Sequence, residues 1–423
     1  MKQIKFGIFG LGRGSNFFEH ALVCNGDVVA VCDKDQKKLN RAKSRLADVA
    51  AYESFDEFIE HPGLEAVFLC NYFNEHAPYA VRLLERGIHV LSECISNATM
   101  ADGVALVRAA EKSDAVYMLA ENYPYMKFNQ EMRRVYKGGT LGKVLLAEGE
   151  YNHPIVQRET NDAMGIVSLC PDSRHWRYHI PRIYYITHAL APLMYITGST
   201  PKRVTAMPMF HPFTEEDGPL YWRLPDRSAV LTCLNDDDSV FRVTGWSQFG
   251  AHDNSYRICA ERGQIENLRG RPDTVVLRYN DWHVPEGAEE YSCYEPSWAA
   301  EDSALAENAG HGGGDYFVIK EFFDCIRNGR RPIFDVYFAT ATASVAILGH
   351  RSALEYGKPY DVPDFRLEED RVKYENDRLT PMYSSDGGVP SIPNTERQEY
   401  VPTEESMAEY DKAVSEVVAR NNK

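Results

Sequence analysis

The sequence predicts an α/β protein in which a doubly wound parallel sheet precedes an α+β domain with an open, mostly antiparallel sheet. Short apolar, strand-like runs alternate regularly with helical patterns from residue 1 to about 120. Beyond Asn122 the strand-like runs become longer and alternate apolar with polar residues. At 423 residues the chain is also too long for one typical core. We therefore expect two domains, residues 1–122 and 123–365, and a C-terminal extension, residues 366–423.

The first strand-like run, residues 4–9, leads directly into a glycine-rich turn, and residues 16–23 then have a helical pattern. This order is the context of a dinucleotide fingerprint in a Rossmann domain. Gly10 permits the sharp turn, Gly12 lets the backbone approach a pyrophosphate, and the helix N-terminus offers free N–H groups. The last glycine of the fingerprint is replaced by Ser15 or shifted to Gly14. We assign the turn to cofactor binding through Gly10, Gly12, Arg13, Gly14 and Ser15.

The second strand-like run, residues 27–33, ends in an acidic residue, Asp33, about 20 residues after Gly12. A carboxylate at this place accepts a hydrogen bond from the ribose 2′-OH of NAD and repels a 2′-phosphate. The alternative is a glycine-rich turn in an ordinary βαβ unit with an aspartate at a strand end. The combination of strand, glycines, helix and acid favours NAD as the cofactor.

The rest of the first domain follows the same alternation, and polar residues follow its strands. Ligands of doubly wound sheets bind beyond the carboxyl ends of the strands, so we expect Asn71, His76, Glu93 and Glu121 to line one crevice. We assign the first three to cofactor binding; Glu93 either touches the nicotinamide ribose or caps the next helix. The expected strands are residues 66–70, 88–91 and 115–119, and the expected helices are residues 36–46, 76–85 and 101–112.

The second domain is predicted as long alternating strands followed by two helices. A glycine-containing turn at residues 261–265 indicates a hairpin. The polar, proline-punctuated tail after Pro363 ends in an expected helix at residues 403–420, which either packs on a neighbouring subunit or forms a loose surface arm. The expected strands are residues 144–152, 228–234, 240–248 and 255–260, and the expected helices are residues 316–328 and 336–356.

Composition excludes several classes of protein. The chain is 44% apolar, but no run approaches the roughly 18 apolar residues of a membrane span. The N-terminus enters a strand at once and leaves no room for a signal peptide, so we expect a cytoplasmic protein. A net charge of −16 argues against nucleic acid or an anionic membrane as partner. The nine cysteines include no C-x-x-C pair, which indicates reduced thiols, and no clustered spacing predicts a metal site.

The order of these motifs resembles the Gfo/Idh/MocA oxidoreductase family (glucose–fructose oxidoreductase, inositol dehydrogenase, rhizopine catabolism). The resemblance implies an NAD(P) cofactor, a small-molecule carbohydrate or cyclitol substrate, and homo-oligomers built through the open sheet. The Glu-Lys-Pro of its dehydrogenases is Glu93-Cys94-Ile95 here, and their Asp-x-Gly-x-His keeps only its histidine, His188. The matching landmarks are Gly10-Leu11-Gly12, Val31-Cys32-Asp33, Asn74-Glu75-His76, residues 87–93, Gly142-Lys143-Val144 and Asp335-Val336-Tyr337.

Residues 185–192, Tyr-Ile-Thr-His-Ala-Leu-Ala-Pro, resemble the Tyr-Pro-Thr-His-Gly-Leu-Gly-Pro stretch of glycoside hydrolase family 109. That family uses NAD to cleave glycosides and also lacks the lysine. Residues 121–125, 149–153 and 311–316 agree with it, whereas Pro154 replaces its aspartate and residues 157–172 match no stretch. The resemblance implies a sugar-facing catalytic set of Glu121, Tyr151, Tyr185 and His188.

Glycoside cleavage of this kind removes a hydride from C3, which acidifies the C2–H, expels the C1 substituent, adds water and returns the hydride. His188 suits the C3 hydroxyl because neutral imidazole accepts a proton near pH 7. Tyr185 and Tyr151 serve as base or acid only where the pKa of the phenol is lowered; otherwise they are packing residues. Tyr185 and His188, three residues apart, share a face of one helix.

Four further residues are assigned to the substrate: His153, Trp176, Arg177 and His311. His153 lies two beyond Tyr151, on the same strand face. Trp176 would stack on a sugar while Arg177 binds hydroxyls or an acidic group, or both belong to a solvated loop. The glycines after His311 allow close approach to a ligand, with Asp315 as a possible helix N-cap. Cys94 is a thiol nucleophile or, as we prefer, a passive small residue.

These features predict an NAD-dependent enzyme that acts on a carbohydrate or glycoside. Transient C3 oxidation with cleavage at C1 is favoured over net oxidation because Cys94 replaces the lysine. The alternatives are a conventional NAD-dependent sugar or cyclitol dehydrogenase, and a catalytically silent NAD-binding sensor.

Overall fold

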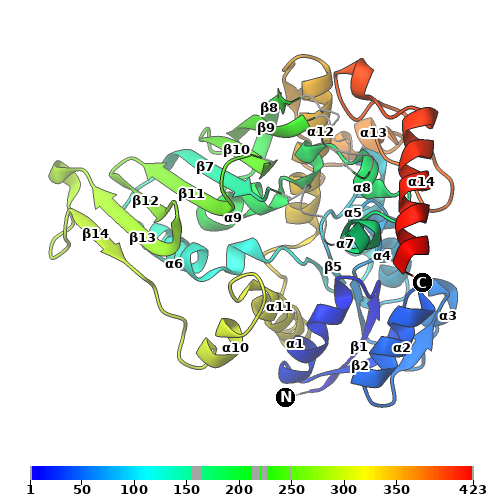
Figure 1. The fold of residues 1–423 in the computed structure, drawn as a ribbon. Coiled ribbons are helices and arrows are strands. Elements are labelled where there is room, and N and C mark those ends of the chain that lie inside the picture. Colours follow the sequence, from blue (N-terminus) through cyan, green and yellow to red (C-terminus); the bar gives the residue numbers. More distant parts are fainter. Residues whose placement is uncertain (1, 155–162, 212–219, 221–225, 248, 422–423) are drawn as a thin grey trace.

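The computed structural model describes the chain except residues 1, 155–162, 212–219, 221–225, 248 and 422–423. Its N-terminal part is a six-stranded parallel sheet of order β3-β2-β1-β4-β5-β6 (Figure 1). The order reverses between β1 and β4, which is where a doubly wound sheet opens its ligand crevice. The strands are β1 (Ile4–Phe9), β2 (Gly26–Cys32), β3 (Ala50–Tyr52), β4 (Ala66–Leu69), β5 (His89–Ser92) and β6 (Tyr117–Leu119).

Helices connect these strands as the alternation predicts. They are α1 (Phe18–Val23), α2 (Gln36–Arg45), α3 (Phe55–Phe58), α4 (His76–Leu84) and α5 (Met100–Lys112). The predicted helix at residues 16–23 is wrong at its start, because a 3₁₀ turn, η1 (Gly14–Phe17), precedes α1. Every residue of β4 is buried, as expected for a central parallel strand.

The second sheet has nine strands in the order β14-β13-β12-β11-β7-β10-β9-β8-β15. Only β7 and β10 pair in parallel; the other neighbours are antiparallel, which confirms an open, mostly antiparallel sheet. The strands are β7 (Val144–Asn152), β8 (Pro201–Phe210), β9 (Asp226–Asn235), β10 (Val240–Ser247), β11 (Asp253–Ala260), β12 (Gly263–Leu268), β13 (Arg271–Tyr279), β14 (Tyr291–Tyr294) and β15 (Tyr360–Asp361).

Two glycines of this sheet let the segment around helix α9 (Thr187–Thr197) approach closely. A Cβ at Gly149 of β7 would lie 2.1 Å from the carbonyl oxygen of Ala189. A Cβ at Gly245 of β10 would lie 2.8 Å from the Cα of Ile186. Only glycine fits at such contacts, so the two positions fix the segment that carries Tyr185 and His188 against the sheet.

Two late helices join the halves of the molecule. Phe323 of α11 (Gly314–Asn328) packs edge-on against Phe6 of β1, with ring centroids 5.4 Å apart. Before α12 (Val336–Leu354), the carbonyl of Phe334 accepts a hydrogen bond from Leu119 of β6. We propose a domain boundary near residue 122, where the first sheet has ended, with 123–365 as the second domain.

The tail contains α13 (Glu368–Tyr374) and α14 (Glu404–Asn421). Helix α14 buries Met407, Tyr410, Val414 and Val417, and the Tyr410 hydroxyl donates to the carbonyl of Cys170 at 2.7 Å. The interpretation of the tail as a loose arm is therefore wrong, since its apolar face packs on its own chain (Figure 1). Among the described residues, no helix is both long enough and apolar enough to cross a membrane.

Candidate functional site

The glycine turn after β1 has three glycines with different surroundings. Gly10 has φ +93°, and a Cβ there would lie 2.3 Å from the carbonyl oxygen of Cys70. A Cβ at Gly14 would lie 2.5 Å from the Cγ2 of Ile8, so this glycine lets η1 pack on the strand. A Cβ at Gly12, by contrast, would meet no described atom within 4 Å. Contacts within the chain do not require glycine at position 12, which fits a cradle for a ligand phosphate.

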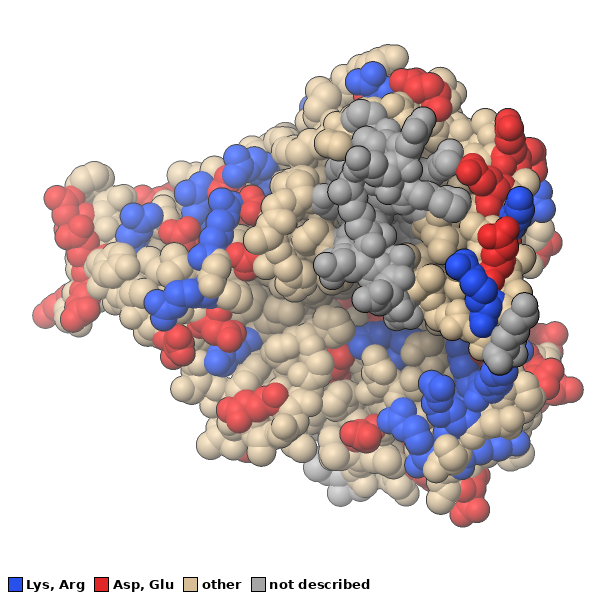
Figure 2. All heavy atoms as spheres, viewed as in Figure 1, with Lys and Arg blue, Asp and Glu red and all other residues tan. Residues whose placement is uncertain are grey.

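Asp33 follows β2 and lies beside this turn. Its Oδ2 accepts a hydrogen bond from the backbone N–H of Leu11 at 2.7 Å, and its Oδ1 from that of Asp35 at 2.9 Å. The Lys38 ammonium of α2 lies 3.6 Å from Oδ2. Lys and Arg side chains gather on this part of the surface (Figure 2). Helix α2, which begins shortly after Asp33, carries Lys37, Lys38, Arg41, Lys43 and Arg45.

At the end of β4, two buried polar side-chain atoms have no hydrogen-bond partner among the described residues. They are the Oδ1 of Asn71 and the Nε2 of His76. The Nδ1 of His76 donates to the carbonyl of Ile95 at 2.8 Å, and burial lowers the pKa of this histidine to about 4. The open Gly12, the strand-end Asp33 and these unpaired atoms fit an NAD site. His76 lies beneath the crevice rather than on its rim.

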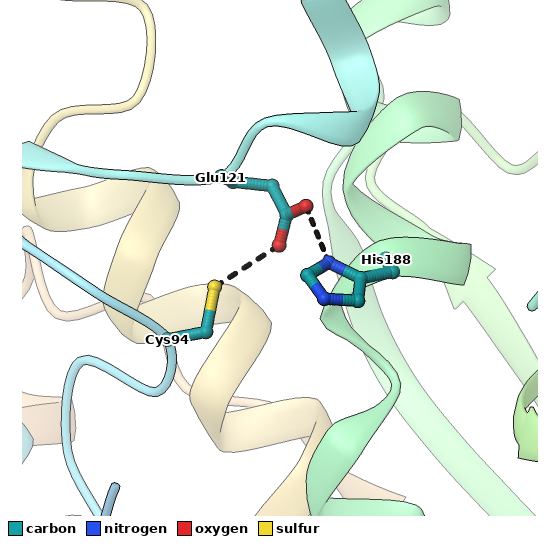
Figure 3. Close-up of side chains that lie close together, drawn as sticks. All are labelled: Cys94, Glu121 and His188. Carbon is teal, nitrogen blue, oxygen red and sulfur yellow. Dashed lines mark hydrogen bonds and ion pairs between the residues drawn. The ribbon is translucent and has the colours of Figure 1, made fainter. Parts of the chain in front are cut away.

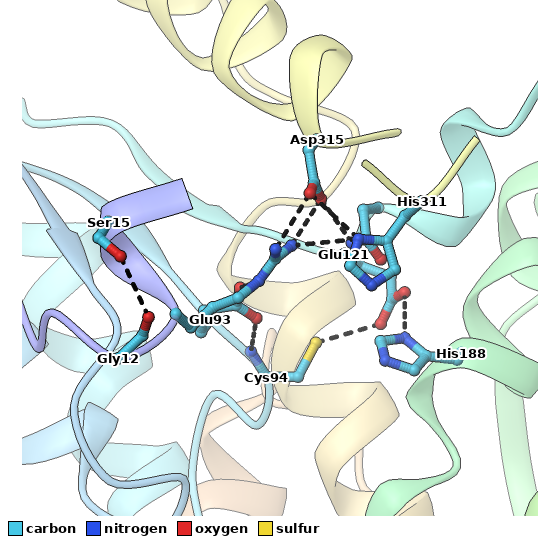
Figure 4. A network of polar contacts seen from close by, with 10 residues as sticks. Gly12, Ser15, Glu93, Cys94, Glu121, His188, His311 and Asp315 are labelled. Carbon is cyan, nitrogen blue, oxygen red and sulfur yellow. Dashed lines mark hydrogen bonds and ion pairs between the residues drawn. The ribbon is translucent and has the colours of Figure 1, made fainter. Parts of the chain in front are cut away.

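Arg13 connects the turn to Asp315 of the second domain, which lies beside His311 (Figure 4). Its Nε donates to Glu93 at 3.1 Å and its Nη1 to Asp315 at 3.0 Å, while the Nδ1 of His311 lies 3.1 Å from Asp315. Burial raises the pKa of Asp315, but His311 and Arg13 outweigh it and hold the pKa low. Asp315 lies in the first turn of α11 and is not its N-cap, which is Gly313. Nor does Glu93 cap α5, since Thr99 does so.

Beyond the ends of β5 and β6, three side chains meet: Cys94, Glu121 and His188 (Figure 3). The Nδ1 of His188 lies 2.7 Å from the Oε1 of Glu121, and the Cys94 thiol donates to Oε2 at 3.1 Å. Burial raises the pKa of Glu121, but the neighbouring His188 outweighs it and lowers the pKa overall. Burial, reinforced by the charge of Glu121, raises the pKa of Cys94 well above its usual value.

Aromatic rings surround His188. Tyr123 stacks on it at 4.1 Å between ring centroids, and Tyr151 and Tyr185 lie edge-on at 4.9 and 5.2 Å. Tyr185 ends a 3₁₀ turn, η4 (Arg182–Tyr185), whereas His188 lies in α9, so the expectation of one shared helix is wrong. Burial raises the pKa of Tyr151 and of Tyr185, so both phenols stay protonated and the lowered pKa that an acid or base role requires is absent.

The residues assigned to the substrate continue this cluster. His153 stacks on Tyr151 at 5.6 Å, as their spacing predicts, and also contacts His252 at 4.9 Å. The Arg177 guanidinium lies over Trp176 at 4.3 Å, and Trp176, only 6% exposed, packs on Phe73. Both belong to the short helix α8 (Trp176–His179). Among the described residues no carboxylate pairs with Arg177, which leaves it free for an oxygen-rich ligand.

Several site residues were not assigned from the sequence: Tyr123, His252 and Phe73, and the contact between Cys94 and Glu121. A signal for that contact existed, because Cys94 and Glu121 each lie two residues beyond neighbouring parallel strands, β5 and β6. His252 and Phe73 reach the site only through the meeting of the two sheets. Of residues 157–172, for which the resemblance to glycoside hydrolase family 109 gives no match, residues 157–162 lie outside the described part of the chain.

Two protein-family models match this chain, one in its N-terminal domain and one in its C-terminal part. Residues 4–121 match the Gfo/Idh/MocA model, described as an oxidoreductase family with an NAD-binding Rossmann fold. The N-terminal domain is therefore an NAD-binding Rossmann domain of this family, which confirms the predicted fold and cofactor. Residues 277–369 match the C-terminal domain of glycosyl hydrolase 109. The resemblance to that branch is thereby confirmed.

The chain is similar along most of its length to curated proteins of that branch. It is 23% identical over 406 residues to a glycosyl hydrolase family 109 protein of Shewanella pealeana, covering 86% of each chain. It is 24% identical over 407 residues to an alpha-N-acetylgalactosaminidase of Shewanella oneidensis, covering 86% of this chain and 85% of that one.

Solved structures share the fold. A levoglucosan dehydrogenase in complex with NADH and levoglucosan has a TM-score of 0.70 at 16% identity, covering 86% of this chain and 100% of that one. An aldose–aldose oxidoreductase from Caulobacter crescentus has a TM-score of 0.64 at 18% identity, covering 85% and 100%.

Proposed function

We propose that the protein is an NAD-dependent enzyme that acts on a carbohydrate or glycoside by transient oxidation at C3 and cleavage at C1. The observation that carries this proposal is the buried pair of His188 and Glu121, placed beyond the strand ends of the Rossmann sheet and enclosed by tyrosines. The relatives named as glycosyl hydrolase 109 proteins, one of them an alpha-N-acetylgalactosaminidase, support a glycoside as substrate. Bound NAD⁺ supplies a reversible hydride acceptor.

His188 is the proton acceptor for the C3 hydroxyl. Its Nδ1 faces the Glu121 carboxylate, which accepts the Nδ1–H and leaves Nε2 with a free lone pair. The lowered pKa of Glu121 keeps it ionised, so that it also stabilises the imidazolium formed when Nε2 takes a proton. Glu121 is fully buried, which strengthens this interaction.

Tyr151 and Tyr185 act as hydrogen-bond donors, because a phenol whose pKa is raised donates a hydrogen bond but is a poor acid. With the pKa of each phenol raised by burial, the hydroxyl is the form present at neutral pH. Such a donor suits the departing C1 oxygen, which gains negative charge as the bond breaks. Arg177, stacked on Trp176, binds sugar hydroxyls or an acidic substituent.

A conventional sugar dehydrogenase is the second candidate. His188 and Glu121 can accept the hydroxyl proton without a lysine at position 94, and the levoglucosan dehydrogenase structure shares the fold.

For either candidate we propose a homo-oligomer that pairs through the open sheet. The ion pairs of Glu148 with Arg242 and Arg257 join β7, β10 and β11.

The test follows two signals from the purified protein incubated with NAD⁺ and a panel of p-nitrophenyl glycosides: aglycone release and NADH absorbance. Aglycone release without net NADH is expected. Stoichiometric NADH without aglycone would replace the proposal by the dehydrogenase. Silence in both signals, with NAD bound, would favour a catalytically silent sensor.

A further inference from the structure

We infer that Cys94, Glu121 and His188 form a binding site for one divalent cation, with Zn²⁺ as the ion that fits best. Each offers one ligand atom, and these atoms all lie within 4.8 Å of one another (Figure 3). The residues lie far apart in the sequence, so their spacing gave no sign of a metal. The inference goes beyond the proposed function, since it stands on side-chain geometry and is tested by metal binding alone.

The distances suit a tetrahedral ion. Zn–S bonds of about 2.3 Å and Zn–N and Zn–O bonds of about 2.0–2.1 Å place neighbouring ligand atoms about 3.3–3.6 Å apart. The thiol sulfur lies 3.1 Å from the Oε2 of Glu121, and the Nδ1 of His188 lies 2.7 Å from its Oε1. Both contacts are hydrogen bonds that need a proton between the two atoms. The two contacts involve different oxygens of Glu121, so a cation that both carboxylate oxygens hold takes the place of these protons when each pair opens by about half an ångström.

The charge balance points the same way. Glu121 is fully buried and contacts His188, the Cys94 thiol and the backbone N–H of Tyr123, and among the described ion pairs neither lysine nor arginine balances its charge. A buried carboxylate is costly unless it is paired or binds a metal. The carboxylate and a Cys94 thiolate together neutralise a divalent ion, while His188 binds as neutral imidazole. Binding releases the proton of the thiol, because a coordinating thiol is deprotonated by the metal.

The donor set selects among metals. A thiolate with an imidazole and a carboxylate suits Zn²⁺, whereas Mg²⁺ and Ca²⁺ prefer sites made of oxygen atoms alone. Three protein ligands leave the fourth tetrahedral position open, the arrangement of catalytic rather than structural zinc sites. A hydroxyl of the substrate that takes this position is polarised, and its pKa falls. Because the ion replaces the Nδ1–H of His188 and leaves the proton on Nε2, His188 acts as the proton acceptor proposed above only in the metal-free protein.

Cobalt provides the test, because Co²⁺ binds at zinc sites and absorbs light. The full-length protein is treated with a chelator, desalted and titrated with CoCl₂ under anaerobic conditions. We expect one Co²⁺ per chain, tetrahedral visible bands, and a thiolate-to-cobalt charge-transfer band that one equivalent of Zn²⁺ abolishes. Cys94→Ala removes the charge-transfer band, and Cys94→Ser weakens binding and also removes it. The matched control, Cys233→Ala, changes another buried thiol and leaves the band intact.

Three results would overturn the inference: no cobalt retained by the wild-type protein, cobalt bound without the charge-transfer band, or a band that survives Cys94→Ala. Thermal unfolding and NAD binding show that each variant is folded, so loss of the band reports the metal site. Because no turnover is measured, a protein that binds cobalt at Cys94 but cleaves no glycoside refutes only the proposed function.

Discussion

At the scale of single residues, protonation decides what each group in the site does. Burial keeps the phenols of Tyr151 and Tyr185 protonated, whereas the contact with His188 keeps Glu121 ionised. The surroundings of each group therefore decide whether it can donate or accept a hydrogen bond. His188 contacts both kinds of group, Glu121 and Tyr185, and its second ring nitrogen can accept a proton.

Removing the hydroxyl of Tyr185 tests the donor role. Tyr185→Phe is expected to leave NAD binding unchanged and to lower turnover at least about a hundredfold, the usual scale for losing one hydrogen-bond donor to a developing negative charge. Tyr184→Phe is the matched control, because this neighbouring buried tyrosine contacts His350 instead. Turnover measured on the same glycoside and NAD binding followed by fluorescence give the comparison. Equal turnover in the two variants would remove Tyr185 from the site.

The carboxylate of Asp33 is expected to set the preference for NAD over NADP. Asp33→Ala should weaken NAD and relax discrimination against NADP, since Lys38, 3.6 Å from the carboxylate, would then face the 2′-phosphate. Asp35→Ala is the control, because Asp35 caps α2 and its loss costs about 1 kcal/mol of stability without altering cofactor preference. The ratio of the two dissociation constants is the readout. An unchanged ratio in Asp33→Ala would show that Asp33 does not face the ribose.

The sequence led to His188 because both resemblances place a histidine there, and to Glu121 because it follows a strand of the first sheet and lies in a stretch that resembles glycoside hydrolase family 109. It did not lead to the contact of Glu121 with Cys94, because the sequence favours a passive small residue at position 94. The protonated state of Tyr185 could not be predicted from the sequence either. Tyr185 is buried by Phe73 and Trp246, which lie in segments distant in the chain. Linear spacing carries no information on such contacts.

At the scale of elements, α14 holds the segment that carries Arg177. Asp411 accepts hydrogen bonds from the backbone N–H of Ser173 at 2.7 Å and from its hydroxyl at 2.8 Å. Tyr410 packs on Tyr178 of α8, with ring centroids 4.8 Å apart. Helix α14 thereby holds α8, which carries Trp176 and Arg177, in position at the site.

Asp411→Ala is expected to raise KM for the sugar about tenfold, with NAD affinity unchanged. The variant loses both hydrogen bonds to Ser173, worth about 1–3 kcal/mol, and α8 loses its support. Lys412→Ala, at the exposed neighbouring position, should behave as wild type. Steady-state kinetics on both variants checks the expectation. An unchanged KM in Asp411→Ala would mean that the tail does not position the substrate segment.

Elements with strong periodicity were predicted within a few residues. Helix α2, expected at residues 36–46, runs from Gln36 to Arg45, and β7 matches residues 144–152. The three-residue strand β3 was missed because so short a run has no measurable period. The predicted helix at residues 16–23 includes the last two residues of the 3₁₀ turn η1, because a 3₁₀ turn that leads into an α-helix has no separate period in the sequence.

At the scale of the whole molecule, buried neutral histidines make the fold sensitive to acid. Burial lowers the pKa of His76, His179 and His350 to about 4 and that of His175 to about 3. In the unfolded chain these groups titrate near pH 6.5. Below that pH the unfolded state binds more protons, so stability is complete above about pH 6.5 and falls as the pH drops toward 4.

The free energy of unfolding should therefore decrease between about pH 6.5 and 4.5, by about 1.4 kcal/mol per pH unit for each such histidine. His350→Gln keeps a hydrogen-bond donor for the carbonyl of Pro393. It should lower the slope of the free energy of unfolding against pH by the contribution of one histidine. Denaturant unfolding at several pH values measures both slopes. A variant slope equal to that of the wild type would show that His350 is not neutral when buried.

The arrangement of the two sheets was predicted only in class. The alternation of strands and helices, and the longer strands beyond Asn122, predicted a parallel sheet followed by an open one. They did not predict that α11 packs on β1 or that Arg13 contacts Asp315. Such contacts link residues about 300 positions apart. They bring the cofactor turn and the sugar-facing residues to one place, on which the proposed function depends.

The most direct test of that function follows deuterium in a glycoside that the protein cleaves. A substrate labelled at C3 is incubated in D₂O, and the released sugar is analysed by NMR and mass spectrometry. Transient oxidation predicts that the label stays at C3, that solvent deuterium enters at C2, and that no net NADH forms. Cleavage without deuterium at C2 would contradict the account, as would transfer of the C3 label to NADH that is released.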